Sequence, residues 1–154
     1  SSGIHSNGLT LAREAATRNH EYTDPFPPNP EKSIGEELLE PTRIYSDLLG
    51  PLREVDTHAA AHVTGGGWTN LTRMGDFRYE ITDPFEAQPV FAFVQQEGDV
   101  TDEEMHRTFN MGTGFVAAMS EADAEKVVEA TEDGRVIGRV KEGEESVSIR
   151  GLEL

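Results

Sequence analysis

The chain contains no cysteine, so it can form neither a disulfide framework nor a thiolate metal site. No run of apolar residues approaches the roughly 20 that a membrane-spanning helix needs. Lysine is also scarce, at three positions only: Lys32, Lys126 and Lys141. The 154 residues nevertheless suffice for one domain with its own core. We therefore expect a single globular domain that does not span a membrane.

Positive charge is in short supply. The chain has 13 Lys and Arg against 29 Asp and Glu, a formal net charge of −16. This balance argues against nucleic acid or an anionic membrane as partner, because both require a basic face. The acidic residues are spread along the chain, which is typical of proteins from a high-salt cytoplasm, where salt screens self-repulsion. We expect such a halophilic origin, with an ordinary acidic protein as the alternative.

Helical and strand patterns alternate along the chain, which predicts an α/β or α+β domain with a mixed sheet flanked by helices. Four prolines within 24–30 predict an irregular surface loop. The closing strands read as a hairpin. The predicted helices are 9–17, 33–39, 46–54, 68–74, 89–97, 101–109 and 122–131; the predicted strands are 55–63, one around Phe77, Tyr79 and Ile81, 115–119, 136–140 and 146–150.

The stretch His62-Val-Thr-Gly-Gly-Gly67 joins a predicted strand to a predicted helix. Glycines at such a junction let the backbone approach a ligand, and the N–H groups of Thr64, Gly65, Gly66 and Gly67 could bind a phosphate. The loop is not a Walker A motif, since no Gly-Lys-Ser/Thr follows. The alternative is a flexible turn without a ligand.

A second polar loop covers 1–8, Ser-Ser-Gly-Ile-His-Ser-Asn-Gly, and leads into a helix. His5 and Asn7 can donate and accept hydrogen bonds, and His5 could transfer a proton near neutral pH. The alternative is a helix start capped by Asn7 or Ser6. His58 and His62 lie about 13 Å apart on one strand face. They cannot share a metal ion, and His62 is the better functional candidate.

Arg107 and Asn110 lie at a helix end before Gly112. They could contact a ligand, although Asn110 could also be only a C-cap. Arg43 lies in a short extended segment and could meet a phosphate, or form a surface ion pair. The acidic run 99–104 lacks EF-hand spacing, so we expect no metal site.

Five motifs occur in a familiar order: the stretch 1–8, Gly35-Glu-Glu-Leu-Leu-Glu-Pro-Thr-Arg-Ile-Tyr45, Ala61-His-Val-Thr-Gly-Gly-Gly67, Glu104-Met-His-Arg-Thr-Phe-Asn-Met-Gly112 and Val136-Ile-Gly-Arg-Val140. Together they resemble the C-terminal domain of the phosphoribosylformylglycinamidine cyclo-ligase family, also called aminoimidazole ribonucleotide synthetase. Trp68-Thr-Asn-Leu-Thr-Arg73 keeps the family's Asn70 and Arg73 but lacks its acid and its proline.

The resemblance implies an ATP-dependent ligase of purine biosynthesis that closes formylglycinamidine ribonucleotide to aminoimidazole ribonucleotide. It implies a cytoplasmic homodimer, a nucleotide substrate, and ATP and Mg bound mostly by an N-terminal domain that this chain lacks. Residues 1–154 would be the C-terminal domain alone, inactive by itself, since the chain begins inside a motif.

The resemblance also implies roles for individual residues. His5, Asn7 and His62 match catalytic positions, 64–67 matches the phosphate loop, and Arg43, Arg107 and Asn110 match possible substrate or ATP contacts. Two alternatives stay open: another member of the same ATP-dependent superfamily, and a free-standing module that binds a phosphate ligand.

Overall fold

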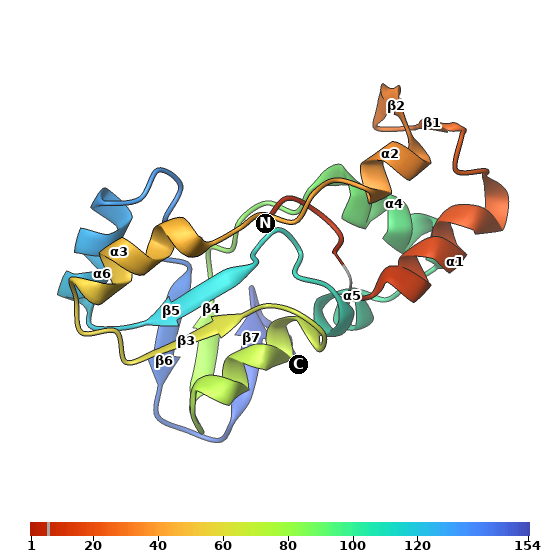
Figure 1. Ribbon diagram of the computed structural model, residues 1–154. Coiled ribbons are helices and arrows are strands. Elements are labelled where there is room, and N and C mark those ends of the chain that lie inside the picture. Colours follow the sequence, from red (N-terminus) through yellow and green to blue (C-terminus); the bar gives the residue numbers. More distant parts are fainter. Residues whose placement is uncertain (6) are drawn as a thin grey trace.

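The computed structural model describes residues 1–5 and 7–154. Its helices and strands alternate, as predicted for an α/β domain with a mixed sheet, and Figure 1 shows their arrangement. The helices are α1 (Leu9–Asn19), α2 (Ile34–Leu38), η1 (Ser46–Leu48), α3 (Leu49–Arg53), η2 (Gly67–Met74), α4 (Pro89–Gly98), α5 (Asp102–Thr108) and α6 (Glu121–Glu129). The strands are β1 (Pro25–Phe26), β2 (Asn29–Ser33), β3 (Ala59–His62), β4 (Arg78–Ile81), β5 (Phe115–Ala118), β6 (Gly138–Lys141), β7 (Ser146–Ile149) and β8 (Leu152–Glu153).

One side of the molecule is helical: α1, α2, α4 and α5 lie together with the β1–β2 hairpin (Figure 1). The predicted apolar face of α1 is buried through Ala12, Ala15 and Ala16, and these small side chains let α1 pack closely on α4. Phe91 and Phe93 of α4 are buried in the same hydrophobic cluster. Ile4 joins this cluster too, so burial of its side chain anchors the N-terminal segment beside the helices.

The other side holds strands β3 to β7, with helices α3 and α6 beside them (Figure 1). Strand β4 is central in a four-stranded sheet of order β6-β4-β7-β8, antiparallel to β6 and parallel to β7. Strands β3 and β5 form a separate antiparallel pair, in which His62 lies opposite Phe115. Trp68 and Leu71 of η2 pack against Tyr79 and Ile81 of β4 in a second hydrophobic cluster. Helix η2 therefore fixes the glycine loop against the main sheet.

Short polar residues start three of the helices. Ser33 and Glu36 form a reciprocal capping box on α2, and Thr101 and Ser120 accept hydrogen bonds from backbone N–H groups at the starts of α5 and α6. Helix α1 is different, because its N-cap is Gly8 in the left-handed conformation without a side-chain cap. The predicted cap by Asn7 is therefore wrong, and the alternative cap, Ser6, lies outside the described residues.

Three further predictions need correction. The proline-rich loop contains the β1–β2 hairpin, since both short strands lie at the edge of the molecule, where missing N–H groups cost little. The strands predicted as a closing hairpin do not pair with each other, because β4 lies between them. The buried strand expected over 55–63 is only Ala59–His62, and His58 before it is exposed.

Smaller differences concern helix type and ends. The helix expected over 68–74 is a 3-10 helix, η2, and the helix over 46–54 divides into η1 and α3. Helix α4 includes Gly98, and its C-cap is Asp99 in the left-handed conformation. None of the helices in the described part of the chain is long and apolar enough to cross a bilayer.

Candidate functional site

A small pocket forms where the N-terminal segment, the end of β3 and the end of α5 meet. Its volume is about 80 Å³, enough for several water-sized groups and hence for a phosphate, but not for a whole nucleotide. Five of its eight lining residues are site residues predicted from the sequence. The pocket is lined by His5, Asn7, Thr42, His62, Val63, Thr64, Thr108 and Asn110.

The glycine loop borders this pocket and has an unusual backbone. Gly66 and Gly67 have φ values of 95° and 52°, the left-handed region that glycine adopts at little cost. Gly67 is also held closely, since a Cβ there would come 2.1 Å from the carbonyl oxygen of His106 in α5. The loop is thus a specific structure packed against α5, which argues against the flexible-turn alternative.

Hydrogen bonds within the loop serve its carbonyl groups. The oxygen of Thr64 accepts from Gly67 N (2.8 Å), and that of Gly66 accepts from both the N (3.1 Å) and the Oγ1 (2.6 Å) of Thr69. Among the described residues, the structure records no acceptor for the backbone N–H groups of Thr64, Gly65 and Gly66. Consecutive N–H groups without internal acceptors are the usual means by which a loop binds an anion.

His5 lies at the other side of the pocket. Its Nε2 is 2.9 Å from the Ser1 Oγ, and its Nδ1 is buried without a partner among the described residues. Burial lowers the pKa of His5 below its ordinary value, because the charged form loses solvation. The neutral imidazole is therefore favoured at neutral pH, and a neutral imidazole can accept a proton.

His62 closes the pocket from the end of β3, and its side chain reaches solvent. The Tyr45 ring meets its imidazole edge to face, with centroids 5.7 Å apart. The Tyr45 ring also stacks on Phe115, the residue opposite His62 in the β3–β5 pair. His62 therefore rests on a fixed aromatic wall while one side stays open to a ligand.

Asn110 and Asn7 fix the two polar edges of the pocket. The Asn110 Nδ2 donates to the Gly3 carbonyl (2.9 Å), and its Oδ1 accepts from Gly112 N (2.9 Å). This side chain ties the N-terminal segment to the chain after α5, so it holds the site together besides lining it. The Asn7 Oδ1 lies against Gly65, where an added Cβ would be 2.8 Å away.

Two predicted contacts lie away from the pocket. The Arg107 Nε donates to Glu103 on the same exposed helix face (2.9 Å). The Arg43 guanidinium pairs with Asp133 and Asp47 and lies over the Tyr45 ring, 5.2 Å from its centroid. Arg43 thus forms the ion pair that was its alternative, and Arg107 forms an ion pair within its own helix. His58 is also outside the pocket, beside Asp56 (3.6 Å).

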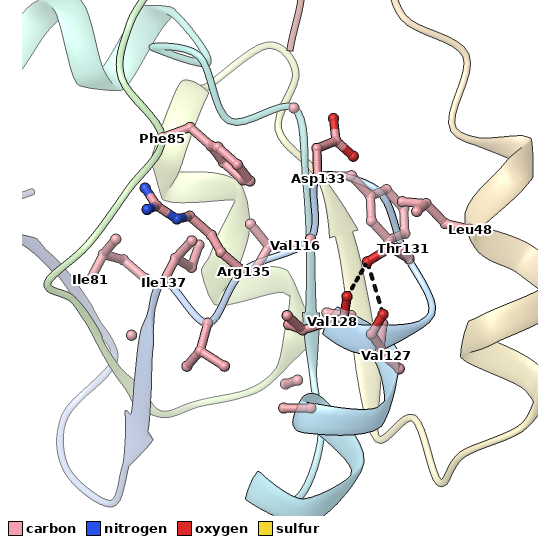
Figure 2. A pocket seen from close by; sticks show the side chains of 18 of the residues that line it. Leu48, Ile81, Phe85, Val116, Val127, Val128, Thr131, Asp133, Arg135 and Ile137 are labelled. Carbon is pink, nitrogen blue, oxygen red and sulfur yellow. Dashed lines mark hydrogen bonds between the residues drawn. The ribbon is translucent and has the colours of Figure 1, made fainter.

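Arg43 instead borders a larger cavity of about 870 Å³ between β4, β5, β6 and α6 (Figure 2). Its walls are mostly apolar, with Val116, Val128 and Ile137 pointing inward in Figure 2. The Thr131 hydroxyl at its edge bonds internally to the carbonyl groups of Val127 and Val128. Arg135 lies over the Phe85 ring (5.4 Å).

Sequence reasoning missed Thr42 and Thr108, whose side chains also line the small pocket. The only sequence signal that pointed to these two threonines is that they precede or follow Arg43 and Arg107, which were predicted as ligand contacts. No group of three or more His, Asp or Glu side chains that could hold a metal ion occurs among the described residues. The pocket itself contains no carboxylate, so its residues do not fit Mg and we assign no step to a metal here.

The fold and the pocket together define the class of protein: a mixed α/β domain with a phosphate-sized polar pocket beside a glycine-rich loop. Residues 1–150 match the family described as AIR synthase related protein, C-terminal domain. The chain belongs to this family.

Curated relatives share this domain. The chain is 45% identical over its full length to the phosphoribosylformylglycinamidine cyclo-ligase of Methanococcoides burtonii, covering 46% of that protein. It is 46% identical to the enzyme of the same name from Methanosarcina acetivorans over 92% of the chain (43% of that protein). For Methanopyrus kandleri the identity is 45% over 93% of the chain (42% of that protein). The chain thus spans less than half the length of these relatives.

Proposed function

We propose that this chain acts as the C-terminal domain of a phosphoribosylformylglycinamidine cyclo-ligase, and that its small pocket binds the phosphate of the nucleotide substrate. The observation that carries the proposal is the convergence of His5, Asn7, His62 and Asn110 beside a loop with three N–H groups that lack internal acceptors. The names and identities of the relatives support the same activity.

In the proposed reaction, the formyl amide oxygen of formylglycinamidine ribonucleotide takes the terminal phosphoryl group of ATP, and ADP leaves. The amidine nitrogen then attacks the activated carbon and closes the imidazole ring. The C–O bond breaks, phosphate departs with its electron pair, and the attacking nitrogen loses one proton. The ATP site and its Mg would belong to the half of the relatives that this chain does not match.

The residues of this chain would bind, orient and exchange protons. The loop 64–67 would hold the ribose phosphate, and Asn7 would orient the substrate at the loop edge. His5 is suited to accept the proton from the ring-closing nitrogen, because burial favours its neutral form. His62 would serve the same function or stabilise the charge that develops on the activated oxygen. Arg43 and Arg107 contribute no contact to this pocket.

Several wider properties belong to the same proposal. The domain would work with its own N-terminal domain in a cytoplasmic, homodimeric ATP-dependent ligase of purine biosynthesis. The 154-residue chain alone would then catalyse no ring closure. Measurable turnover by the isolated chain would contradict this shared-site arrangement.

Alanine substitutions of the two neighbouring histidines test the site. In a protein that carries this domain together with the ATP-binding half, we expect His62→Ala to lower turnover by about 100-fold, as is typical for loss of a group that transfers protons. His58→Ala is the matched control, because its side chain lies outside the pocket. Equal and small losses in both variants would overturn the assignment of His62.

A further inference from the structure

Asn70 lies in η2 directly behind the glycine loop and is almost completely buried, with 1% of its surface exposed. Its Nδ2 lies 2.6 Å from the Gly67 oxygen, 3.0 Å from the Gly65 oxygen and 3.4 Å from the Thr64 oxygen. We propose that Asn70 is a positioning residue that holds the loop in its anion-binding form by drawing the loop carbonyl groups inward. The proposal rests on the proposed function of the loop as a phosphate site.

The pattern of hydrogen bonds supports this role. Asn70 donates hydrogen bonds to three of the loop carbonyl oxygens, and Thr69 donates to the remaining one, that of Gly66. Every carbonyl group from 64 to 67 therefore has a donor within the loop or η2. Since successive peptide groups alternate donor and acceptor, a loop whose carbonyl groups are bound inside leaves its N–H groups for a ligand.

The chemistry of the amide explains why this residue type is needed. Only the –NH₂ end can donate, and it has two hydrogens for three oxygens that converge on it. A carboxylate of the same shape would repel those oxygens. The Asn70 Oδ1 is buried without a partner in the described part of the chain, so the side chain does not satisfy its own hydrogen bonds fully. Asn70 therefore stabilises the loop conformation even though burying its unpaired Oδ1 costs free energy.

The experiment measures sulfate binding to the 154-residue chain, because sulfate resembles phosphate but does not titrate near neutral pH. Amide chemical shifts of Thr64, Gly65 and Gly66 report both the loop conformation and the binding. Asn70→Leu keeps the approximate shape without a donor, and Asn70→Asp removes the donor reversibly. Thr72→Ala is the matched control: it removes a hydrogen bond to the Thr69 carbonyl within the same 3-10 helix and leaves the loop carbonyls alone.

We expect Asn70→Leu and Asn70→Asp to weaken sulfate binding at least tenfold and to shift the three loop amides in the free protein, while Thr72→Ala changes neither. Lowering the pH from about 8 to about 5 should restore part of the binding in Asn70→Asp relative to Asn70→Leu, since a buried carboxyl beside carbonyl oxygens takes up a proton readily and then donates. Both variants lose the same amide, so a general loss of stability would affect both. Sulfate binding that returns at low pH in Asn70→Asp but not in Asn70→Leu therefore indicates that the donor positions the loop.

Two results would contradict the proposal in distinguishable ways. If the wild-type chain binds sulfate and both Asn70 variants bind it within twofold, positioning by Asn70 is wrong while the phosphate site stands. If the wild-type chain shows no sulfate-dependent shifts in the loop amides, the phosphate site itself is wrong and the role of Asn70 with it. Should a variant unfold, the remaining variant and the free-protein amide shifts still decide.

Discussion

Replacing Gly67 by alanine should destabilise the domain strongly. The added Cβ would lie 2.1 Å from the His106 oxygen, and 2.8 Å and 2.9 Å from the Arg107 carbonyl carbon and the Phe109 oxygen. These are backbone atoms, so no flexible side chain can move aside. The left-handed φ of 52° costs an alanine about 1–2 kcal/mol, and forced overpacking about 1–3 kcal/mol. The expected loss is therefore about 2–5 kcal/mol, a large share of the 5–15 kcal/mol typical of a domain.

Urea unfolding followed by circular dichroism measures this loss, with Gly151→Ala as the control. Gly151 also has a positive φ, 90°, but an added Cβ would meet no atom within 4 Å. It therefore isolates the conformational cost of about 1–2 kcal/mol. If Gly67→Ala unfolds at the same urea concentration as Gly151→Ala, the close approach of the loop to α5 is refuted.

Three other perturbations test the site and the surface. Gly65→Ala should change the free energy of unfolding by no more than about 1 kcal/mol but weaken phosphate binding in a titration, because its Cβ would displace the Asn7 oxygen; unchanged affinity would mean that Asn7 does not border the anion. Because the pKa of His5 is lowered in the fold from 6.5, the folded state takes up fewer protons than the unfolded chain, so stability should fall as pH drops through about 6.5 toward the lowered value. His5→Gln should flatten that stretch of the stability–pH curve, and an identical curve would show that His5 does not cause it. With a net charge of −16, the melting temperature should rise steeply from low to molar salt, and a flat response would rule out salt-screened repulsion.

Local signals allowed much of the secondary structure to be predicted. The helices predicted over 33–39, 101–109 and 122–131 begin at or next to their predicted starts, where Ser33, Thr101 and Ser120 are the N-caps, since a cap depends only on residues three positions away. The pairing of strands was harder to predict from the sequence. The partner of 146–150 is decided by which faces can be buried together, and the parallel pairing with β4 joins residues almost 70 positions apart.

The candidate site, too, could be predicted from the sequence only in part. Family motifs pointed to His5, Asn7 and His62, and the structure brings all three to one pocket, although their roles stay predictions. The same motifs pointed to Arg43, but its partner Asp133 lies 90 residues away in the chain and no pattern in the sequence links them. A charged side chain forms an ion pair with whichever opposite charge the fold places beside it.

The central position of β4 has a consequence for synthesis. Its neighbours β6 and β7 are both translated later, beginning almost 60 residues after β4 ends. Until they emerge from the ribosome, β4 has two unpaired edges, and the apolar side chains of Tyr79 and Ile81 have no sheet to join. Pairing over such a separation is slow. A nascent chain released before β7 would thus carry an open strand prone to aggregation, and productive folding must wait for the last residues of the domain.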